Sequence, residues 1–227
     1  MTPRLPHRIL ALDASGALAS IGLLDGLSLI ADRQAPSGSG LTDRLAVMLA
    51  ETLAEAKEKA AIDPASIEAI AVMIGPGSFT GIRASLALAY GFGQALTIPI
   101  HGVRLTDAFQ QDLPSLTRPL WIAASARRGH VFIERAGAVA CYAEADLPIP
   151  SMPVALAGER ADWLAEQYGA RDVDVELTEA RLPSLHSIAA ALRIRIATGG
   201  APIEALPLYV EPPLAKLPTR ALRPAPQ

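Results

Sequence analysis

The sequence predicts an α/β protein with two lobes, each formed by a small sheet and its helices. Hydrophobic residues occupy 51% of the 227 positions and charged residues only 19%, which is enough apolar material for a core and excludes a chain disordered throughout. Residues 8–103 show the order strand, strand, strand, helix, strand, helix. From residue 104 the same order recurs with a weaker hydrophobic pattern and fewer residues. We therefore expect a first lobe over 1–103 and a smaller second lobe over 104–227, ending in an extended, proline-rich tail.

The first lobe opens with three β-rich runs. The Asp25-Gly26 pair between the second and third runs is a strong hairpin signal, because both turn positions must tolerate positive φ. Apolar residues at helical spacing predict a helix over 41–60, and a nearly uncharged segment predicts another over 79–96. The expected strands are 8–13, 19–24, 27–33, 67–74 and 98–101.

The second lobe repeats this order with fewer residues. Glycine-containing turns at Arg128-Gly129 and Ala136-Gly137 separate three β-rich runs, and a further apolar run leads through Gly158 into a helix. The expected strands are 121–124, 131–135, 139–142 and 154–157, and the expected helices are 159–168 and 184–197.

Composition excludes several classes of function. The chain carries 20 basic and 23 acidic residues, a net charge of −3, so it should not wrap much nucleic-acid backbone by itself. The single cysteine, Cys141, cannot form an internal disulfide, and the histidines form no metal-binding pair. The uncharged stretch 84–103 is interrupted by glycine and proline, which argues against a membrane span. The expected compartment is a reducing cytoplasm, with no membrane association.

A glycine-rich turn, Gly75-Pro76-Gly77-Ser78-Phe79-Thr80-Gly81, follows a strand and opens a helix, where backbone N–H groups can hold an anion. It lacks the lysine of a Walker A loop and the spacing of a dinucleotide fingerprint. The alternative is a plain connection in which Gly77 supplies a special φ and Ser78 caps the helix.

Candidate cofactor-binding residues are few. Asp13 ends the first strand and, with Ser15 in the following turn, could contact phosphate or a water-bound magnesium; alternatively, it bonds its own turn. Gly158 would lie near a nucleotide held between the lobes. No arrangement of residues identifies a catalytic nucleophile, a base or a metal site. The basic turn Arg127-Arg128-Gly129 could touch RNA or an anion, or be a solvated hairpin tip.

Helix 79–96 carries one charge, Arg83, and should be covered on more than one side. Small residues recur along it every fourth position, so another backbone could approach closely. Two interpretations are open: the stripe packs on the chain's own helix 41–60, or part of this surface is a protein–protein interface. The stripe consists of Gly81, Ser85, Ala89 and Gly93.

Several segments together resemble the bacterial TsaB (YeaZ) proteins. They are Ile9-Leu10-Ala11-Leu12-Asp13-Ala14-Ser15, then Gly75-Pro76-Gly77-Ser78-Phe79-Thr80-Gly81-Ile82-Arg83, and Pro207-Leu208-Tyr209-Val210 near the end. The segment Ala126-Arg127-Arg128-Gly129-His130-Val131-Phe132 resembles the family's D-A-R-R-G-E-V-Y hairpin. The resemblance extends over nearly the whole chain and implies a two-lobed actin-like fold of the sugar-kinase/Hsp70 type.

The resemblance also implies a function. TsaB proteins take part in making N6-threonylcarbamoyladenosine next to the anticodon of tRNA, as a required non-catalytic subunit that pairs with the paralogous transferase TsaD. A TsaE-like ATPase joins the pair, tRNA is reached through the complex, ATP and magnesium act at the level of the complex, and the isolated subunit forms a homodimer. The residues expected at the partner interface, on helices 41–60 and 79–96, are Leu41, Arg44, Leu45, Met48, Gly81, Arg83, Ser85, Leu86, Ala89, Tyr90 and Gly93.

This sequence departs from the family pattern at a few positions. The departures are Ala14, Leu41, Ser125, His130 and Glu211, where the family usually has threonine, histidine, two acids and arginine. The rival hypothesis is an independent actin-like phosphotransferase or ATPase, with nucleotide between the lobes and Asp13 near magnesium. Magnesium-dependent ATP binding would distinguish the two.

Overall fold

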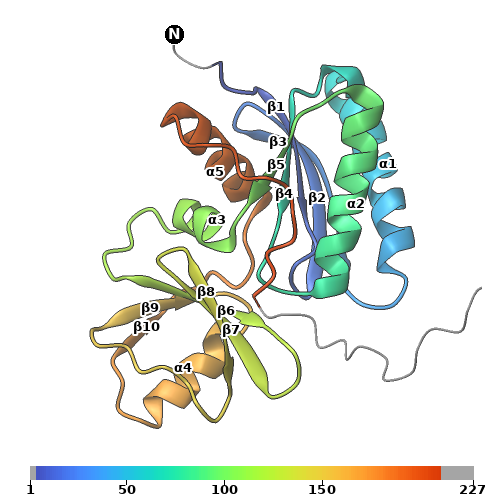
Figure 1. Cartoon of the computed structure of the whole chain (residues 1–227). Helices are drawn as coiled ribbons and strands as arrows, with labels where there is room; N and C mark the ends of the chain where they lie inside the picture. The colour runs from blue at the N-terminus through green and yellow to red at the C-terminus, as the bar shows by residue number, and fades with distance from the viewer. Residues whose placement is uncertain (1–3, 211–227) are drawn as a thin grey trace, which may run out of the picture.

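Two five-stranded sheets, each with its own helices, form the two lobes of the chain (Figure 1). The computed structural model describes residues 4–210. The first sheet has the strand order β3-β2-β1-β4-β5 and the second has β10-β9-β6-β7-β8. In both, an antiparallel meander is extended by two parallel strands, β4 and β5 in the first sheet and β9 and β10 in the second. The α/β architecture predicted from the sequence is therefore confirmed.

The first part of the chain contains every strand and helix predicted for it. A two-residue turn joins β2 to β3 as expected, but it consists of Gly26 and Leu27, one position later than predicted, because Asp25 still pairs with Ser28. Both long helices have the predicted bounds. The elements are β1 Arg8–Asp13, β2 Leu18–Asp25, β3 Ser28–Pro36, α1 Leu41–Ala60, a 3-10 turn Pro64–Ser66, β4 Ala69–Met73, α2 Phe79–Leu96 and β5 Ile100–Val103.

The second part adds two elements that the sequence pattern did not predict, the helix α3 and the strand β10. Both are short, so periodicity over their length carries little signal. The elements are α3 Leu105–Asp112, β6 Leu120–Ser125, β7 His130–Arg135, β8 Ala138–Ala143, β9 Val154–Ala157, α4 Ala161–Gly169, β10 Val175–Leu177 and α5 Leu185–Ala197.

The first sheet is buried on both faces, because successive strand residues point to opposite sides. Leu10 and Leu12 belong to the core beneath α1 and α2, whereas Ile9 and Ala11 belong to a second core with residues of α3 and α5. Although α5 follows the second sheet in the sequence, it packs on β1, β2, β4 and β5 of the first. The helices α1 and α2 therefore cover one face of the first sheet, and α5 covers the other (Figure 1).

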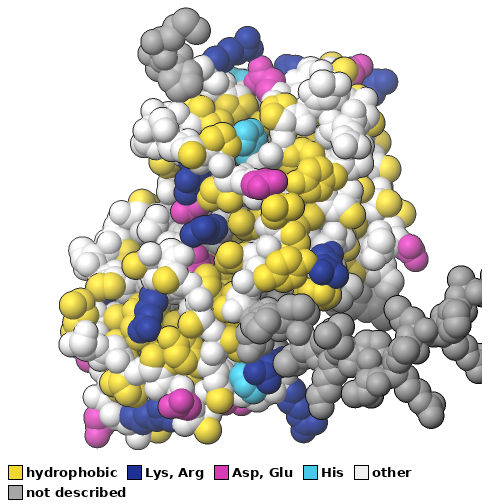
Figure 2. Space-filling view, viewed as in Figure 1, with side chains coloured by type: hydrophobic (Ala, Val, Ile, Leu, Met, Phe, Trp, Pro, Cys, Tyr) yellow, Lys and Arg dark blue, Asp and Glu magenta, His cyan; other side chains and the backbone are white. Residues whose placement is uncertain are grey.

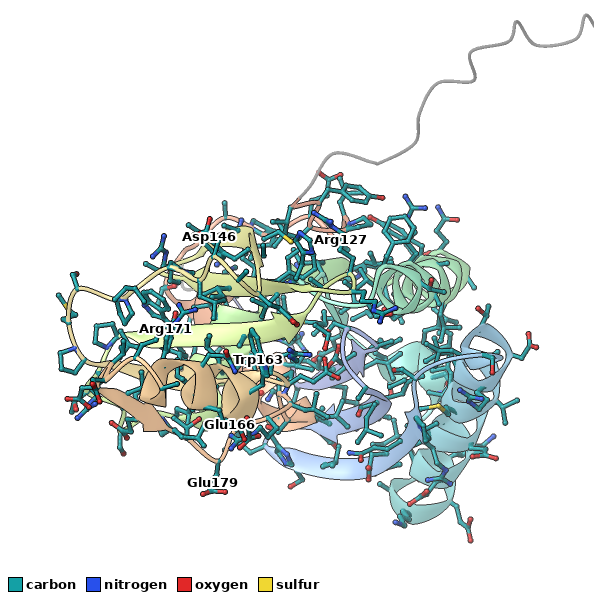
Figure 3. The ribbon with its side chains drawn as sticks, turned by 90° about the horizontal axis from the view of Figure 1, so that it is seen from below. Arg127, Asp146, Trp163, Glu166, Arg171 and Glu179 are labelled. Atoms are coloured by element: carbon teal, nitrogen blue, oxygen red, sulfur yellow. The ribbon has the colours of Figure 1, made fainter. Side chains whose placement is uncertain are left out.

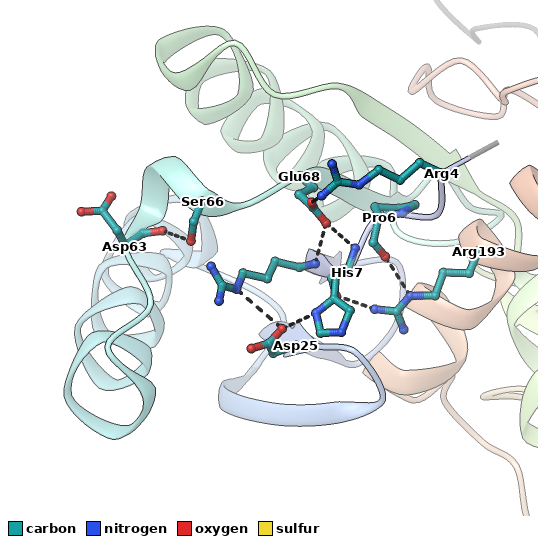
Figure 4. A network of polar contacts seen from close by, with 9 residues as sticks. Arg4, Pro6, His7, Asp25, Asp63, Ser66, Glu68 and Arg193 are labelled. Carbon is teal, nitrogen blue, oxygen red and sulfur yellow. Dashed lines mark hydrogen bonds and ion pairs between the residues drawn. The ribbon is translucent and has the colours of Figure 1, made fainter.

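A polar network ties the start of β1 to α5 and to the segment before β4 (Figure 4). Arg193 of α5 donates to the backbone oxygens of Pro6 at 3.1 Å and His7 at 2.8 Å. The Glu68 carboxylate accepts from Arg4 at 2.8 Å and from the backbone N–H groups of His7 and Arg8. These contacts join residues far apart in the sequence and hold α5 on the first sheet.

After α5 the chain returns to the first sheet as a segment that we call the C-terminal strap, residues 203–210. Gly102 of β5 donates to the Ile203 oxygen at 2.8 Å, and Leu208 donates to the Ile74 oxygen at 2.9 Å. Gly102 permits this approach, since a Cβ there would lie 2.7 Å from the Glu204 oxygen. The tail expected beyond the strap, including Glu211, lies outside the described residues.

The uncharged stretch 84–103 divides into the end of α2, a turn and strand β5. Thr97 ends the helix in the left-handed conformation with φ 56°. Within residues 4–210, no helix is both long and apolar enough to cross a membrane.

Candidate functional site

The small-residue stripe of α2 faces the chain's own first sheet. A Cβ at Gly81 would lie 1.9 Å from the Ala14 oxygen, and one at Gly93 would lie 2.7 Å from the Ile100 side chain. Ser85 and Ala89 are fully buried between them. The absence of bulky side chains thus lets the backbone of α2 come close to the turn after β1 and to β5, so the stripe is covered within the chain.

The residues expected at the partner interface divide into a buried group and an exposed group. Most are buried and shape the helix packing, and as the chain is folded their side chains offer no surface to a partner. Those buried are Leu41, Leu45, Met48, Gly81, Ser85, Leu86, Ala89 and Gly93. Arg83 and Tyr90 are exposed, and Arg44 is half-buried, donating to the backbone oxygens of Ser39 and Pro36.

The outer faces of α1 and α2 nevertheless form an exposed apolar surface, which we call the helix face. It contains no charged residue between Arg44 and Glu51 on α1, and none after Arg83 on α2. Val47 is 56% exposed and Tyr90 is 37% exposed. The residues predicted for an interface on these two helices are mainly inward-facing, and the exposed set lies on the opposite side of each helical repeat. The face consists of Ala46, Val47, Ala50, Ala54, Ala87, Tyr90 and Gly91.

Asp13 is buried and bonds its own turn. Its Oδ1 accepts from the Ser15 N–H and from the Ser15 hydroxyl, both at 2.7 Å. Burial raises the pKa of this carboxyl, an effect that the two Ser15 hydrogen bonds oppose and the negative charge of Glu159 reinforces. Of the two interpretations of Asp13, ligand contact or bonding of its own turn, this geometry matches the second.

Backbone donors of the glycine-rich turn are also used internally. Ser78 donates its N–H to the Ser15 oxygen at 2.7 Å, and Gly81 donates its N–H to the Ser78 hydroxyl at 3.2 Å. A Cβ at Gly77 would lie 2.2 Å from the Ser15 oxygen. The turn therefore packs tightly against the turn between β1 and β2, and these N–H groups are not directed at a ligand.

Gly158 has a comparable structural role. Its φ is 99°, and a Cβ there would lie 2.5 Å from the Ala123 oxygen. Its N–H donates to the Ala180 oxygen at 2.8 Å. Among residues 4–210, no group of three or more His, Cys, Asp or Glu side chains could hold a metal ion.

A cleft of about 930 Å³ lies between the lobes, a volume in the range of ligand pockets. Its walls are the turn after β1, the start of α2, the turn between β6 and β7, and the C-terminal strap. Hydrophobic side chains gather on the face between the lobes (Figure 2), and Arg127 lies at the edge of the second sheet that faces α2 (Figure 3). The lining residues include Ser15, Ala17, Ser78, Phe79, Ile82, Arg83, Ser125, Arg127, Phe132, Glu159, Leu208, Tyr209 and Val210.

Three planar side chains meet at the mouth of this cleft. The Arg83 guanidinium lies 3.9 Å from the centre of the Phe79 ring and 5.6 Å from that of Tyr209. Its Nη2 and Nε donate to the Tyr209 hydroxyl at 2.6 and 3.2 Å, and the two rings lie 6.3 Å apart. We call these three residues the aromatic clasp, because they join the strap to α2.

Four of the family departures lie within the described residues. Ala14 and Leu41 are buried, Ser125 lines the cleft, and the His130 Nδ1 lies 3.2 Å from the Arg128 oxygen. The small Ala14 side chain suits a turn whose carbonyl oxygen contacts Gly81.

The sequence model of the family described as "TsaD: tRNA N6-adenosine threonylcarbamoyltransferase" matches residues 41–168, more than half of the chain. The chain belongs to this family. An uncharacterized Mycobacterium bovis protein is 30% identical over 218 residues, which cover 92% of this chain and 93% of that protein, and a Mycobacterium tuberculosis protein matches equally well. Family membership links the chain to threonylcarbamoyl modification of tRNA adenosine.

Two solved structures from Pseudomonas aeruginosa share the fold. One is described as similar to the peptidase YeaZ, with a TM-score of 0.69 and 23% identity over 90% of this chain and 99% of that chain. The other, YeaZ itself, has a TM-score of 0.67 and 24% identity over 89% of this chain and 99% of that chain. Together with the family match, they confirm the resemblance to TsaB (YeaZ) proteins and show that the chain has the fold of YeaZ.

Proposed function

We propose that this chain is a non-catalytic subunit of the machinery that makes N6-threonylcarbamoyladenosine in tRNA, and that it pairs with a TsaD-type transferase through the helix face. The observation that carries the proposal is the exposed surface of small and apolar residues on α1 and α2, which has no charged residue between Arg44 and Glu51 on α1 or after Arg83 on α2. Contiguous apolar surface on a soluble domain usually marks an interaction site.

Further parts of the assembly follow from this proposal. The same face would bind a second copy of the chain when the transferase is absent. A TsaE-like ATPase would join the pair in the cytoplasm, where ATP and magnesium would act at the level of the complex. Asp13 and Ser15 support a non-catalytic role for this chain, because Asp13 accepts both of its hydrogen bonds from Ser15, and the Ser15 oxygen accepts from the Ser78 N–H.

The helix face gives the first test. We expect Tyr90→Glu and Val47→Glu, each at an exposed position, to weaken pairing with the TsaD-type subunit at least tenfold, because each buries an unpaired charge in the interface. Size-exclusion chromatography with light scattering on the mixed subunits measures this. A charge at Ser85 or Ala89 would be a poor probe, since both positions are in the core.

Ile194→Glu is the matched control. Ile194 is 45% exposed on α5, which covers the opposite face of the first sheet, and its variant should pair like the wild type. Unchanged pairing by both helix-face variants, with their fold intact, would refute the assignment of the interface.

A second candidate function, an independent nucleotide-binding enzyme, is favoured only by the size of the cleft. We expect calorimetric titration with ATP and magnesium to detect no binding to the isolated chain, because the N–H groups of Ser78 and Gly81 are used internally. Magnesium-dependent binding that disappears in Asp13→Asn would instead support the enzyme.

A further inference from the structure

The aromatic clasp is exposed despite its apolar content. Phe79 is 57% exposed and Tyr209 is 56% exposed, and both rings contact the Arg83 guanidinium. The two contacts to the Tyr209 hydroxyl use two of the five N–H donors of Arg83. The clasp therefore presents planar faces, together with cationic donors, at the mouth of a cavity.

Basic side chains lie across the cleft from the clasp. Arg127 lines the cavity, and Arg128 and Gly129 follow it as an exposed turn before β7. Gly129 has φ 75°, and a Cβ there would meet no atom within 4 Å, so the tip of this turn is exposed. The function proposed above does not use this basic turn.

The two features together match the chemistry of an unpaired RNA segment. Aromatic rings and guanidinium planes stack on unstacked bases of any sequence, while basic side chains contact the phosphates. The cavity, about 930 Å³, has room for a base with its sugar. Glu159 on its wall repels phosphate, so a base would enter while the backbone stays at the basic mouth.

We propose that the mouth of the interlobe cleft binds a single-stranded RNA loop, with one unpaired base stacked on the aromatic clasp and the neighbouring phosphates near the basic turn before β7, where Arg128 is exposed. That this RNA is the anticodon loop of tRNA rests on the proposed function. The net charge of −3 makes general binding to duplex backbone weak, so the contact selects an exposed base rather than a helix.

The test is fluorescence anisotropy of the full chain with a labelled anticodon stem-loop RNA, at low and moderate salt. We expect Phe79→Leu and Tyr209→Leu each to lower the affinity about tenfold, the loss typical of one stacked base. Tyr209→Phe keeps the ring and should retain most of the binding. A blunt RNA duplex of the same length should bind at least tenfold more weakly than the stem-loop.

Trp163→Leu is the matched control, because Trp163 also contacts a guanidinium, that of Arg160 at 4.3 Å, but lies on α4 away from the cleft lining (Figure 3). It should bind RNA like the wild type. Cooperative thermal unfolding of every variant establishes that each is folded.

Equal RNA affinity of Phe79→Leu, Tyr209→Leu and the wild type would overturn the proposal. So would clasp variants, Phe79→Leu or Tyr209→Leu, that lose pairing with the TsaD-type subunit but keep RNA affinity, because the clasp would then belong to the protein interface. RNA binding is measured on the chain alone and tests this proposal. Pairing with the TsaD-type subunit is measured on the helix-face variants and tests the proposed function. Failure of one proposal is therefore distinguishable from failure of the other.

Discussion

Gly81→Ala should destabilise the chain by about 3 kcal/mol or more, although it adds a single methyl group. The new Cβ would lie 1.9 Å from the Ala14 oxygen, which is backbone and cannot move aside as a flexible side chain can. Either α2 must shift away from the first sheet or the turn after β1 must rearrange. Urea unfolding followed by circular dichroism measures the loss as a lower midpoint at an unchanged slope.

Gly91→Ala is the matched control on the same helix. Gly91 is exposed, and a Cβ there would meet no atom within 4 Å. Alanine has the higher helix propensity, so this variant should be stabilised by up to about 1 kcal/mol. If the two variants shift stability by similar amounts, the close approach of α2 to Ala14 does not exist in solution.

This contrast also shows how far the sequence predicts the site. Small residues recur every four positions along α2, and this spacing correctly indicated that another part of the backbone lies close to the helix. The residues are Gly81, Ser85, Ala89 and Gly93. Periodicity identifies one face of a helix but does not identify the element that packs against it. Here the stripe packs against the turn at Ala14 and against β5, and not only against helix α1. The exposed residues beside the stripe, such as Ala87 and Tyr90, became recognisable only once the buried face was known.

The strands other than β10, and the long helices, could be predicted because each depends on local pattern. The aromatic clasp could not, since Arg83 and Tyr209 are 126 residues apart and meet only when the strap returns to the first sheet. The packing of α5 on the first sheet is of the same kind: its sequence position places it after the second sheet, whereas Arg193 anchors it to the start of β1. Such contacts follow from topology and not from periodicity.

Glu134 is the second position with a large expected effect. It is fully buried on β7, and neither carboxylate oxygen reaches hydrogen-bond geometry with a partner. Burial raises the pKa of Glu134 to about 7, although the hydroxyl and N–H of nearby Thr106, at the start of α3, favour the charged form. The folded chain therefore holds this proton more tightly than the unfolded chain, whose glutamate has a pKa of 4.5.

The sign of the pH dependence follows from this difference. The stability contributed by the neutral carboxyl is fully present below pH 4.5 and is lost as the pH rises towards 7, about 3 kcal/mol in total. Glu134→Gln cannot ionise, so it should exceed the wild type in unfolding free energy by about 3 kcal/mol at pH 8 and by less than about 1 kcal/mol at pH 5. Glu58→Gln, at an exposed position of α1, should stay within about 0.5 kcal/mol of the wild type at both pH values. A constant difference between Glu134→Gln and the wild type from pH 5 to pH 8 would mean that Glu134 is solvated or paired in solution, and that the start of α3 does not bury a proton against the second sheet.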